Sequence, residues 1–283
     1  MAYPTVQGPY GLKPVNLIGG QFYAGNVRQL QIAYGYATSI GCGDVVALAK
    51  GLVIRATLTT DGTAEENIGV FLGCSFTNPV TKQKQFSQYY PAGTLAGDIF
   101  AVVSDDPDLV YKAVVCSATT VVGSGSQALI GQNMSIIDNV LNLATGNSRL
   151  ALTAIVAGVP ATTAALPIRV LDVVRDTAIS TAVPYTSIST VTITVPALTH
   201  ALIAGSSVEV VAANGQVKPT GAFTVADYAI GATAIVTNYD ASGTGVQQIP
   251  NSAGTLIITQ YPELLVKINF GSHRYNVALA IAA

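Results

Sequence analysis

The stretch NIGVFLGCSF, from Asn67 to Phe76, gives the clearest indication of the fold. Its apolar residues Ile68, Val70 and Leu72 recur at every second position. This spacing places side chains on one face of a β-strand. We therefore expect a strand here, with these three side chains on a shared face.

Short apolar segments separated by glycine-containing turns surround this strand. They include RQLQIA (28–33), GCGDVVALAKGLVIRA (41–56) and GTLAGDIFAVVSDDPDLVYKAVV (93–115). Such a succession is typical of a β-barrel or β-sandwich. We expect a mainly β protein with a barrel- or sandwich-like core domain, an extended N-terminal arm and an inserted small β-sandwich-like module.

The segment Ser126–Val140 is the best candidate for a helix. Gly131 and Asn133 weaken it, because both residues lower helix propensity. A single turn or an irregular segment therefore remains an equal alternative.

Composition narrows the classes of function. Half of the 283 residues are hydrophobic and only 10% are charged, with a formal net charge of −2. Ordinary soluble domains carry about 25% charged residues. The 13 Lys and Arg residues form no basic cluster, so we expect no nucleic-acid partner. High apolar content with little charge is typical of a protein that buries surface in an assembly.

Neither a membrane segment nor a signal peptide is expected. The N-terminus lacks a basic region followed by an apolar run. Residues 150–168 are uncharged and long enough to cross a bilayer, but Gly158, Pro160 and Pro167 make them a poor helix. We interpret this stretch as strand, loop and strand, and expect a soluble protein with no membrane partner.

The three cysteines, Cys42, Cys74 and Cys116, form no C-x-x-C pair. Their odd number argues against a complete set of disulfides. We expect buried, reduced thiols in a protein that folds in a reducing cytoplasm, and no metal site.

Three domains are expected along the chain. Residues 1–28 are rich in Gly, Pro and apolar side chains, which indicates an extended arm that docks on protein. Residues 181–260 form a small β module. Residues 29–180 with 261–283 form the β-rich core domain.

Strand patterns support this division. In STVTITVPALTH (189–200), Val191, Ile193 and Val195 alternate with threonines, as in a half-buried strand. In the last strand, Leu264, Val266, Ile268 and Phe270 share a face. We expect this strand to pair with IRVLDVVRD (168–176), so that the module is an insertion between two adjacent strands.

The sequence offers little chemistry. His200 and His273 are the only histidines, and no G-x-S-x-G elbow frames a serine. Asp105, Asp106 and Asp108 suggest either a weak Ca²⁺ loop or, more simply, a turn built by Asp and Pro. Glycine-rich phosphate loops are absent from the sequence. We expect no enzyme, no catalytic residues and no cofactor.

Candidate residues for contact with a partner protein or a neighbouring subunit lie in three places. For Tyr89 and Tyr90 a core role and a subunit contact are both open. His273, Arg274 and Tyr275 are expected to tie the end of the last strand to neighbouring backbone or to an adjacent subunit. The candidates in the N-terminal arm are Tyr10, Leu12, Val15, Leu17, Ile18 and Phe22.

With these segments in view, the chain resembles structural proteins of tailed-bacteriophage heads, of the decoration or cement type. The resemblance rests on the order of several stretches along residues 1–180 and 261–276. These stretches are GPYGLKPVNLIGGQFYAGNVRQLQIAYGYATSIGCGDVV (8–46), IGVFLGC (68–74), QYYPAG (88–93), SDDPDLVYKA (104–113), TGNSRLAL (145–152), LPIRVLDVVRD (166–176) and LLVKINFGSHRYN (264–276). The block at about 180–260 departs from it and looks like a small β module that projects outward.

The resemblance implies a virion protein that is made in the bacterial host cytoplasm and lies on the outside of an icosahedral capsid. It would bind the phage major capsid protein and stabilise the shell against internal DNA pressure. It also implies a homo-oligomer, with a trimer favoured. Two alternatives remain open. A receptor- or glycan-binding module at 181–260, of head or tail-fibre type, would use Tyr228 and Tyr239. A major shell subunit would need a long helix, for which the sequence has no convincing candidate.

Overall fold

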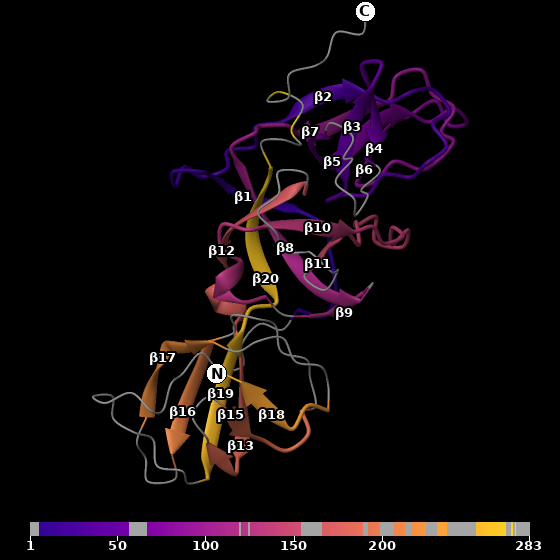
Figure 1. Cartoon of the computed structure of the whole chain (residues 1–283). Helices are drawn as coiled ribbons and strands as arrows, with labels where there is room; N and C mark the ends of the chain where they lie inside the picture. Colours follow the sequence, from indigo (N-terminus) through magenta and orange to yellow (C-terminus); the bar gives the residue numbers. More distant parts are fainter. Residues whose placement is uncertain are drawn as a thin grey trace, which may run out of the picture. The chain divides into compact units, whose positions relative to one another are not determined.

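The computed structural model describes residues 6–56, 67–118, 120–123, 125–153, 166–188, 192–198, 207–212, 217–224, 231–236 and 253–269, and the single residues 273 and 275. Strands dominate this part of the chain, and the two short helices are 3₁₀ turns. The prediction of a mainly β, barrel- or sandwich-like fold is confirmed (Figure 1). Within the described ranges, no helix has the length and apolar character to cross a membrane.

The chain forms two compact units. The larger unit comprises residues 6–123, 131–172 and 264–283, and the smaller one comprises residues 1–5, 124–130 and 173–263. The chain thus leaves the larger unit after residue 172 and returns at residue 264, whereas the sequence indicated an insertion at 181–260.

One half of the larger unit is a six-stranded sheet. Its order is β2-β7-β5-β3-β4, with β6 paired to β5. A parallel bridge between Ile32 and Val53 joins the two ends of this order, so the sheet curls around its own core. The strands are β2 (Arg28–Gln31), β3 (Val45–Ala49), β4 (Leu52–Arg55), β5 (Asn67–Thr77), β6 (Lys84–Ser87) and β7 (Phe100–Ser104).

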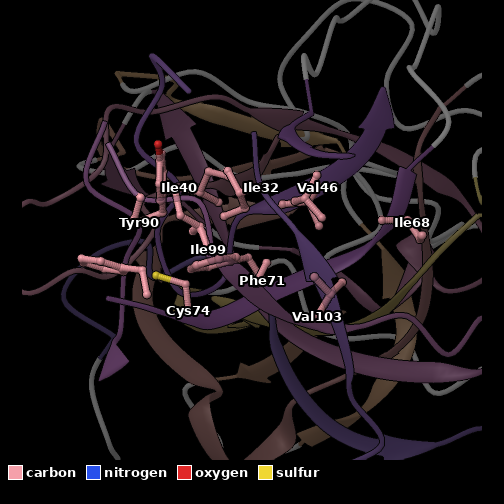
Figure 2. Packing of buried hydrophobic residues seen from close by; sticks show 13 residues of the cluster. Ile32, Ile40, Val46, Ile68, Phe71, Cys74, Tyr90, Ile99 and Val103 are labelled. Atoms are coloured by element: carbon pink, nitrogen blue, oxygen red, sulfur yellow. The ribbon is translucent and has the colours of Figure 1, made fainter. Parts of the chain in front are cut away.

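The core of this sheet consists of buried hydrophobic side chains. Figure 2 shows the side chains of Ile32, Phe71 and Ile99 pointing toward one another, and each is at most 1% exposed. Tyr90 and Cys74 complete the same cluster. Fully burying side chains of this size stabilises a fold by about 1.5 to 3 kcal/mol each.

Strand β5 corrects one detail of the sequence prediction. Its pairing with β7 shifts register between Phe71 and Gly73, which marks a β-bulge. A bulge changes the face that the following residues occupy. A second register shift, in the pairing with β3, lies at Ile68. Ile68 and Phe71 both belong to the core cluster of this sheet, whereas Val70 does not, and Leu72 is only half-buried. The prediction that Ile68, Val70 and Leu72 share one face is wrong.

The other half of the larger unit is a seven-stranded sheet of order β1-β8-β11-β10-β12-β20, with β9 paired to β8. β20 also pairs with β8, so five of these strands close into a ring. The strands are β1 (Lys13–Leu17), β8 (Leu109–Ala118), β9 (Val121–Val122), β10 (Asn133–Ile137), β11 (Ala151–Thr153), β12 (Ile168–Val173) and β20 (Glu263–Ile268).

Three sequence predictions concern strands of this sheet. The pairing of the last strand with residues 168–176 is confirmed, because β12 and β20 are neighbours, and Leu264, Val266 and Ile268 are all buried. Part of the expected arm is a strand of the chain's own sheet, since β1 pairs with β8. The candidate helix at 126–140 is instead a 3₁₀ turn (Gln127–Leu129) followed by β10.

The smaller unit is a β-sandwich. A four-stranded sheet, β13-β19-β16-β17, and a three-stranded sheet, β14-β15-β18, share one hydrophobic core. Ile193 and Val195 are buried in it and Thr194 is exposed, as the alternation predicts. Its strands are β13 (Ile179–Tyr185), β14 (Ser187–Ile188), β15 (Thr192–Thr194), β16 (Ser207–Ala212), β17 (Val217–Thr224), β18 (Ala234–Val236) and β19 (Gly254–Gln260), and a 3₁₀ turn (Arg175–Thr177) precedes them.

Candidate functional site

A tight hairpin at residues 13–22 presents the most exposed apolar side chains of the predicted contact set. Asn16 bridges Phe22, and the Leu17 amide donates to the Gln21 carbonyl at 2.8 Å. Gly19 and Gly20 form the turn with φ of +95° and +84°, angles that L side chains rarely adopt. The Ile18 amide donates to the Asp108 carbonyl at 2.9 Å and fixes the hairpin to the start of β8.

An apolar groove lies beside this hairpin. It has a volume of about 270 Å³, and residues from β8, β12 and β20 line it together with the turn. These lining residues are Asn16, Leu17, Ile18, Gly19, Gly20, Val110, Leu171 and Leu265. We call it the hairpin groove. Phe22 is 90% exposed, Ile18 47% and Val15 43%, so the hairpin offers apolar contact area to a partner.

Apart from His273, which is described below, two residues of the predicted contact set lie in the interior instead. Leu12 and Tyr90 are at most 1% exposed, and the Tyr90 hydroxyl donates to the Tyr36 carbonyl at 2.9 Å. The expectation that they contact a partner is wrong, because this chain already encloses them. For Tyr90 the core alternative is the correct one. Tyr89 is half-buried, and its carbonyl accepts from Ser87 Oγ at 2.6 Å.

Tyr10 lies under two lysines. Lys13 Nζ is 4.1 Å and Lys112 Nζ 5.9 Å from the centre of its ring, a cation–π arrangement. Lys13 and Lys112 are directly opposite in the pairing of β1 with β8. The half-buried Tyr10 ring therefore supports two neighbouring positive charges.

His273 and Tyr275, which follow the last strand, contact other segments of the larger unit. His273 is fully buried and forms a parallel bridge with Asn67 at the start of β5. The Tyr275 hydroxyl donates to Asp105 Oδ2 at 2.5 Å, and Arg28 binds both Asp105 and the Tyr275 hydroxyl. We call these residues the C-terminal latch. Arg274 lies outside the described residues.

The sequence predicted that this segment ties the end of the last strand to neighbouring backbone or to an adjacent subunit. Tying the strand end to neighbouring backbone is confirmed for His273, and its burial excludes a direct contact with another subunit. Tyr275 is 46% exposed. Burial and the hydrogen bond to Asp105 raise the pKa of Tyr275 to about 12.

The acidic stretch after β7 is a turn. The Asp106 carboxylate accepts the Asp108 amide at 2.9 Å, which is the pattern of an Asx-turn. Asp108 lies 3.7 Å from Lys267, and Asp105 belongs to the latch. No group of three or more metal-ligating side chains occurs among the described residues. The turn interpretation therefore accounts for all three carboxylates.

The cysteines are free thiols. Burial raises the pKa of Cys74 to about 12 and that of Cys116 to about 11. Burial also raises the pKa of the half-buried Cys42, although Lys13 opposes the shift. All three are thus protonated at neutral pH and weak as nucleophiles. His200 lies outside the described residues.

Sequence reasoning missed the far wall of the hairpin groove and the partners of Tyr275. Leu265 lies between the buried Leu264 and Val266 and points to the opposite face of β20. An apolar residue on the outward side of an alternating strand is the signal that could have found it. Arg28 and Asp105 carried no such signal, because they are 77 positions apart and meet only through the pairing of β2 with β7.

Comparisons with protein-family models, with curated proteins and with solved structures gave no match for this chain.

Proposed function

We propose that this protein is a structural component of a phage virion that binds the outer surface of the head and stabilises the icosahedral capsid. The resemblance of residues 1–180 and 261–276 to head decoration proteins supports it. The observation that carries it in the fold is the hairpin groove with Phe22, Ile18 and Val15 at its side. The partner is the major capsid protein, and the protein acts as a homo-oligomer, with a trimer favoured.

The proposed binding to the capsid would be driven by burial of apolar surface. Phe22 projects from a hairpin that two glycines and the Ile18 hydrogen bond hold in one shape. A preformed apolar projection loses little conformational entropy when a partner covers it. Burying one Phe side chain contributes about 1.5 to 3 kcal/mol, and a symmetric shell repeats each contact many times.

Binding to pre-formed shells that lack the protein tests this proposal. Phe22→Ser should weaken binding by roughly 10- to 150-fold, the equivalent of one buried Phe. Phe86→Ser is the matched control, because Phe86 is 85% exposed and lies on β6 of the other sheet. The control should bind as the native protein does. Equal binding by both variants, or a larger loss with Phe86→Ser, would contradict the proposed surface.

The stabilising role has a separate readout. Shells that carry the protein should release their DNA at a higher temperature than shells without it. Identical release temperatures, at saturating occupancy of the shell, would rule out a cementing role while leaving binding itself intact.

A further inference from the structure

The imidazole ring of His273 is part of the C-terminal latch, and its protonation state determines which hydrogen bonds it can form. The backbone amide of Tyr275 donates to His273 Nδ1 at 3.3 Å, so Nδ1 acts as an acceptor and is unprotonated. A neutral imidazole with a free Nδ1 carries its hydrogen on Nε2. Nε2 is buried and has no well-formed hydrogen bond within the described part of the chain, although the ring interacts weakly with the Asp105 backbone. The hydrogen bond from the Tyr275 amide therefore favours the neutral ring.

Protonation would oppose this arrangement in two ways. A hydrogen on Nδ1 would face the Tyr275 amide hydrogen, and two donors cannot form a hydrogen bond. The new positive charge would also lie at a site with 0% exposure, where charge is poorly solvated. Both effects act on the residue that links the last strand to Asn67 of β5.

We propose that His273 is an acid-sensitive switch: its neutral ring holds His273 and Tyr275 on β5 and on the turn between β7 and β8, and its protonation releases these two residues. Release would separate Tyr275 from Arg28 and Asp105, which lie on β2 and after β7. The latch thus couples the end of β20 to the six-stranded sheet in a pH-dependent way. This inference does not depend on the proposed function.

The charges around the ring determine the direction of the effect. Burial lowers the pKa of His273 below 6.5 and nearby Lys267 lowers it further, whereas the charges of Asp105 and Asp106 and a hydrogen bond with the Asp105 backbone raise it. Arg28 already pairs with Asp105, which reduces the negative charge that faces the ring. The balance leaves the pKa lowered.

The direction of the pH dependence follows from the difference in the pKa of His273 between the latched and the released segment. The unfolded or released segment has the ordinary pKa of 6.5 and takes up a proton more readily than the latched segment does. The latch is therefore fully closed above pH 6.5 and weakens as the pH falls below it. The equilibrium constant for opening should rise by up to about tenfold per pH unit in that range.

Hydrogen–deuterium exchange of the full chain tests the switch. Protection factors, corrected for the intrinsic pH dependence of exchange, would be compared at pH 7.5 and at pH 5 for peptides that cover β20 through Tyr275. We expect protection there to fall at the lower pH, by no more than about tenfold per pH unit below 6.5. Peptides from β19 of the smaller unit are the internal control and should keep theirs.

His273→Gln is the matched variant. A glutamine amide can accept the Tyr275 amide hydrogen through Oε1 but does not titrate, so protection should be the same at both pH values. Loss of protection at pH 5 in the variant as large as in the native protein would overturn the proposal. So would unchanged protection in the native protein.

A second measurement covers the case in which His273→Gln does not fold. The chain has two histidines, so nuclear magnetic resonance of the ring protons, assigned with His200→Gln, follows His273 directly. We expect a titration midpoint below 6.5 for His273, and the Tyr275 amide should shift with the same midpoint. A midpoint at or above 6.5, or a Tyr275 amide that does not respond, would overturn the switch.

Discussion

Arg55 Nε donates a hydrogen bond of 3.1 Å to Asp44 Oδ2, and the same guanidinium binds Asp138, which follows β10. Asp44 is fully buried, and the Gly41 amide also donates to its Oδ2 at 2.8 Å. Arg55 ends β4 of the six-stranded sheet, whereas β10 belongs to the seven-stranded sheet. One side chain therefore joins the two halves of the larger unit through a partly buried ion pair.

Removing this guanidinium should be costly. Arg55→Met leaves the Asp44 carboxylate buried without its counter-ion, which typically lowers the free energy of unfolding by about 3 to 5 kcal/mol. Urea denaturation measures the change. Lys84→Met is the control, because Lys84 pairs with Asp98 in the open, with both side chains over 40% exposed, and should leave the midpoint nearly unchanged. Similar losses in the two variants would contradict a special role for Arg55.

Gly69 of β5 should tolerate no side chain. A Cβ there would lie 2.1 Å from the Ser104 carbonyl oxygen at the end of β7, so Gly69→Ala must push two paired strands apart. We expect a loss of about 1 to 3 kcal/mol in the free energy of unfolding, as for other overpacked sites. Gly97→Ala has open space around its Cβ and serves as the control. If thermal unfolding gave equal midpoints for both variants, this packing of β5 on β7 would be incorrect.

The raised pKa of the Tyr275 hydroxyl predicts that the stability of the fold declines at alkaline pH. Its pKa is raised from 10.0 to about 12, so the folded state favours the neutral phenol. The contribution of the phenol is complete below pH 10.0 and is lost as the pH rises from there toward 12. Tyr275→Phe should reduce the decline in stability over this range, measured by urea unfolding at several pH values. An unchanged decline in the variant would contradict the hydrogen bond to Asp105.

The three thiols should differ in reactivity. Cys74 and Cys116 are buried with pKa values of about 12 and 11, and Cys42 is only half-buried. Alkylation of the native protein at mildly alkaline pH, followed by mass spectrometry, should modify Cys42 first and leave the other two intact until the protein unfolds. Rapid modification of Cys74 under native conditions would show that the core of the six-stranded sheet is open.

The sequence predicts the buried face of a strand correctly where apolar and polar side chains alternate without interruption. Leu264, Val266 and Ile268 all face the interior, because β20 has a regular pleat and period-two spacing determines its faces. In β5 the same argument failed for Ile68, Val70 and Leu72, because the two register shifts depend on the partner strands and leave no local signature beyond a glycine.

Other parts of the site depend on contacts that are distant in sequence. The glycine- and proline-rich segment before residue 20 looked like an arm because its local pattern is extended, and only its pairing with β8 shows that residues 13–17 are a strand of the same sheet. Tyr89 and Tyr90 are adjacent, yet one is half-buried and the other lies in the core. Composition cannot separate such neighbours, because the face of each depends on the strands that surround it.

Electron cryomicroscopy of phage heads saturated with this protein tests the central claim most directly. The account predicts density for the protein on the outer surface of the shell, with the hairpin at residues 13–22 and Phe22 against the major capsid protein. Density only inside the head or on the tail, or an outer attachment that leaves this hairpin in solvent, would contradict it.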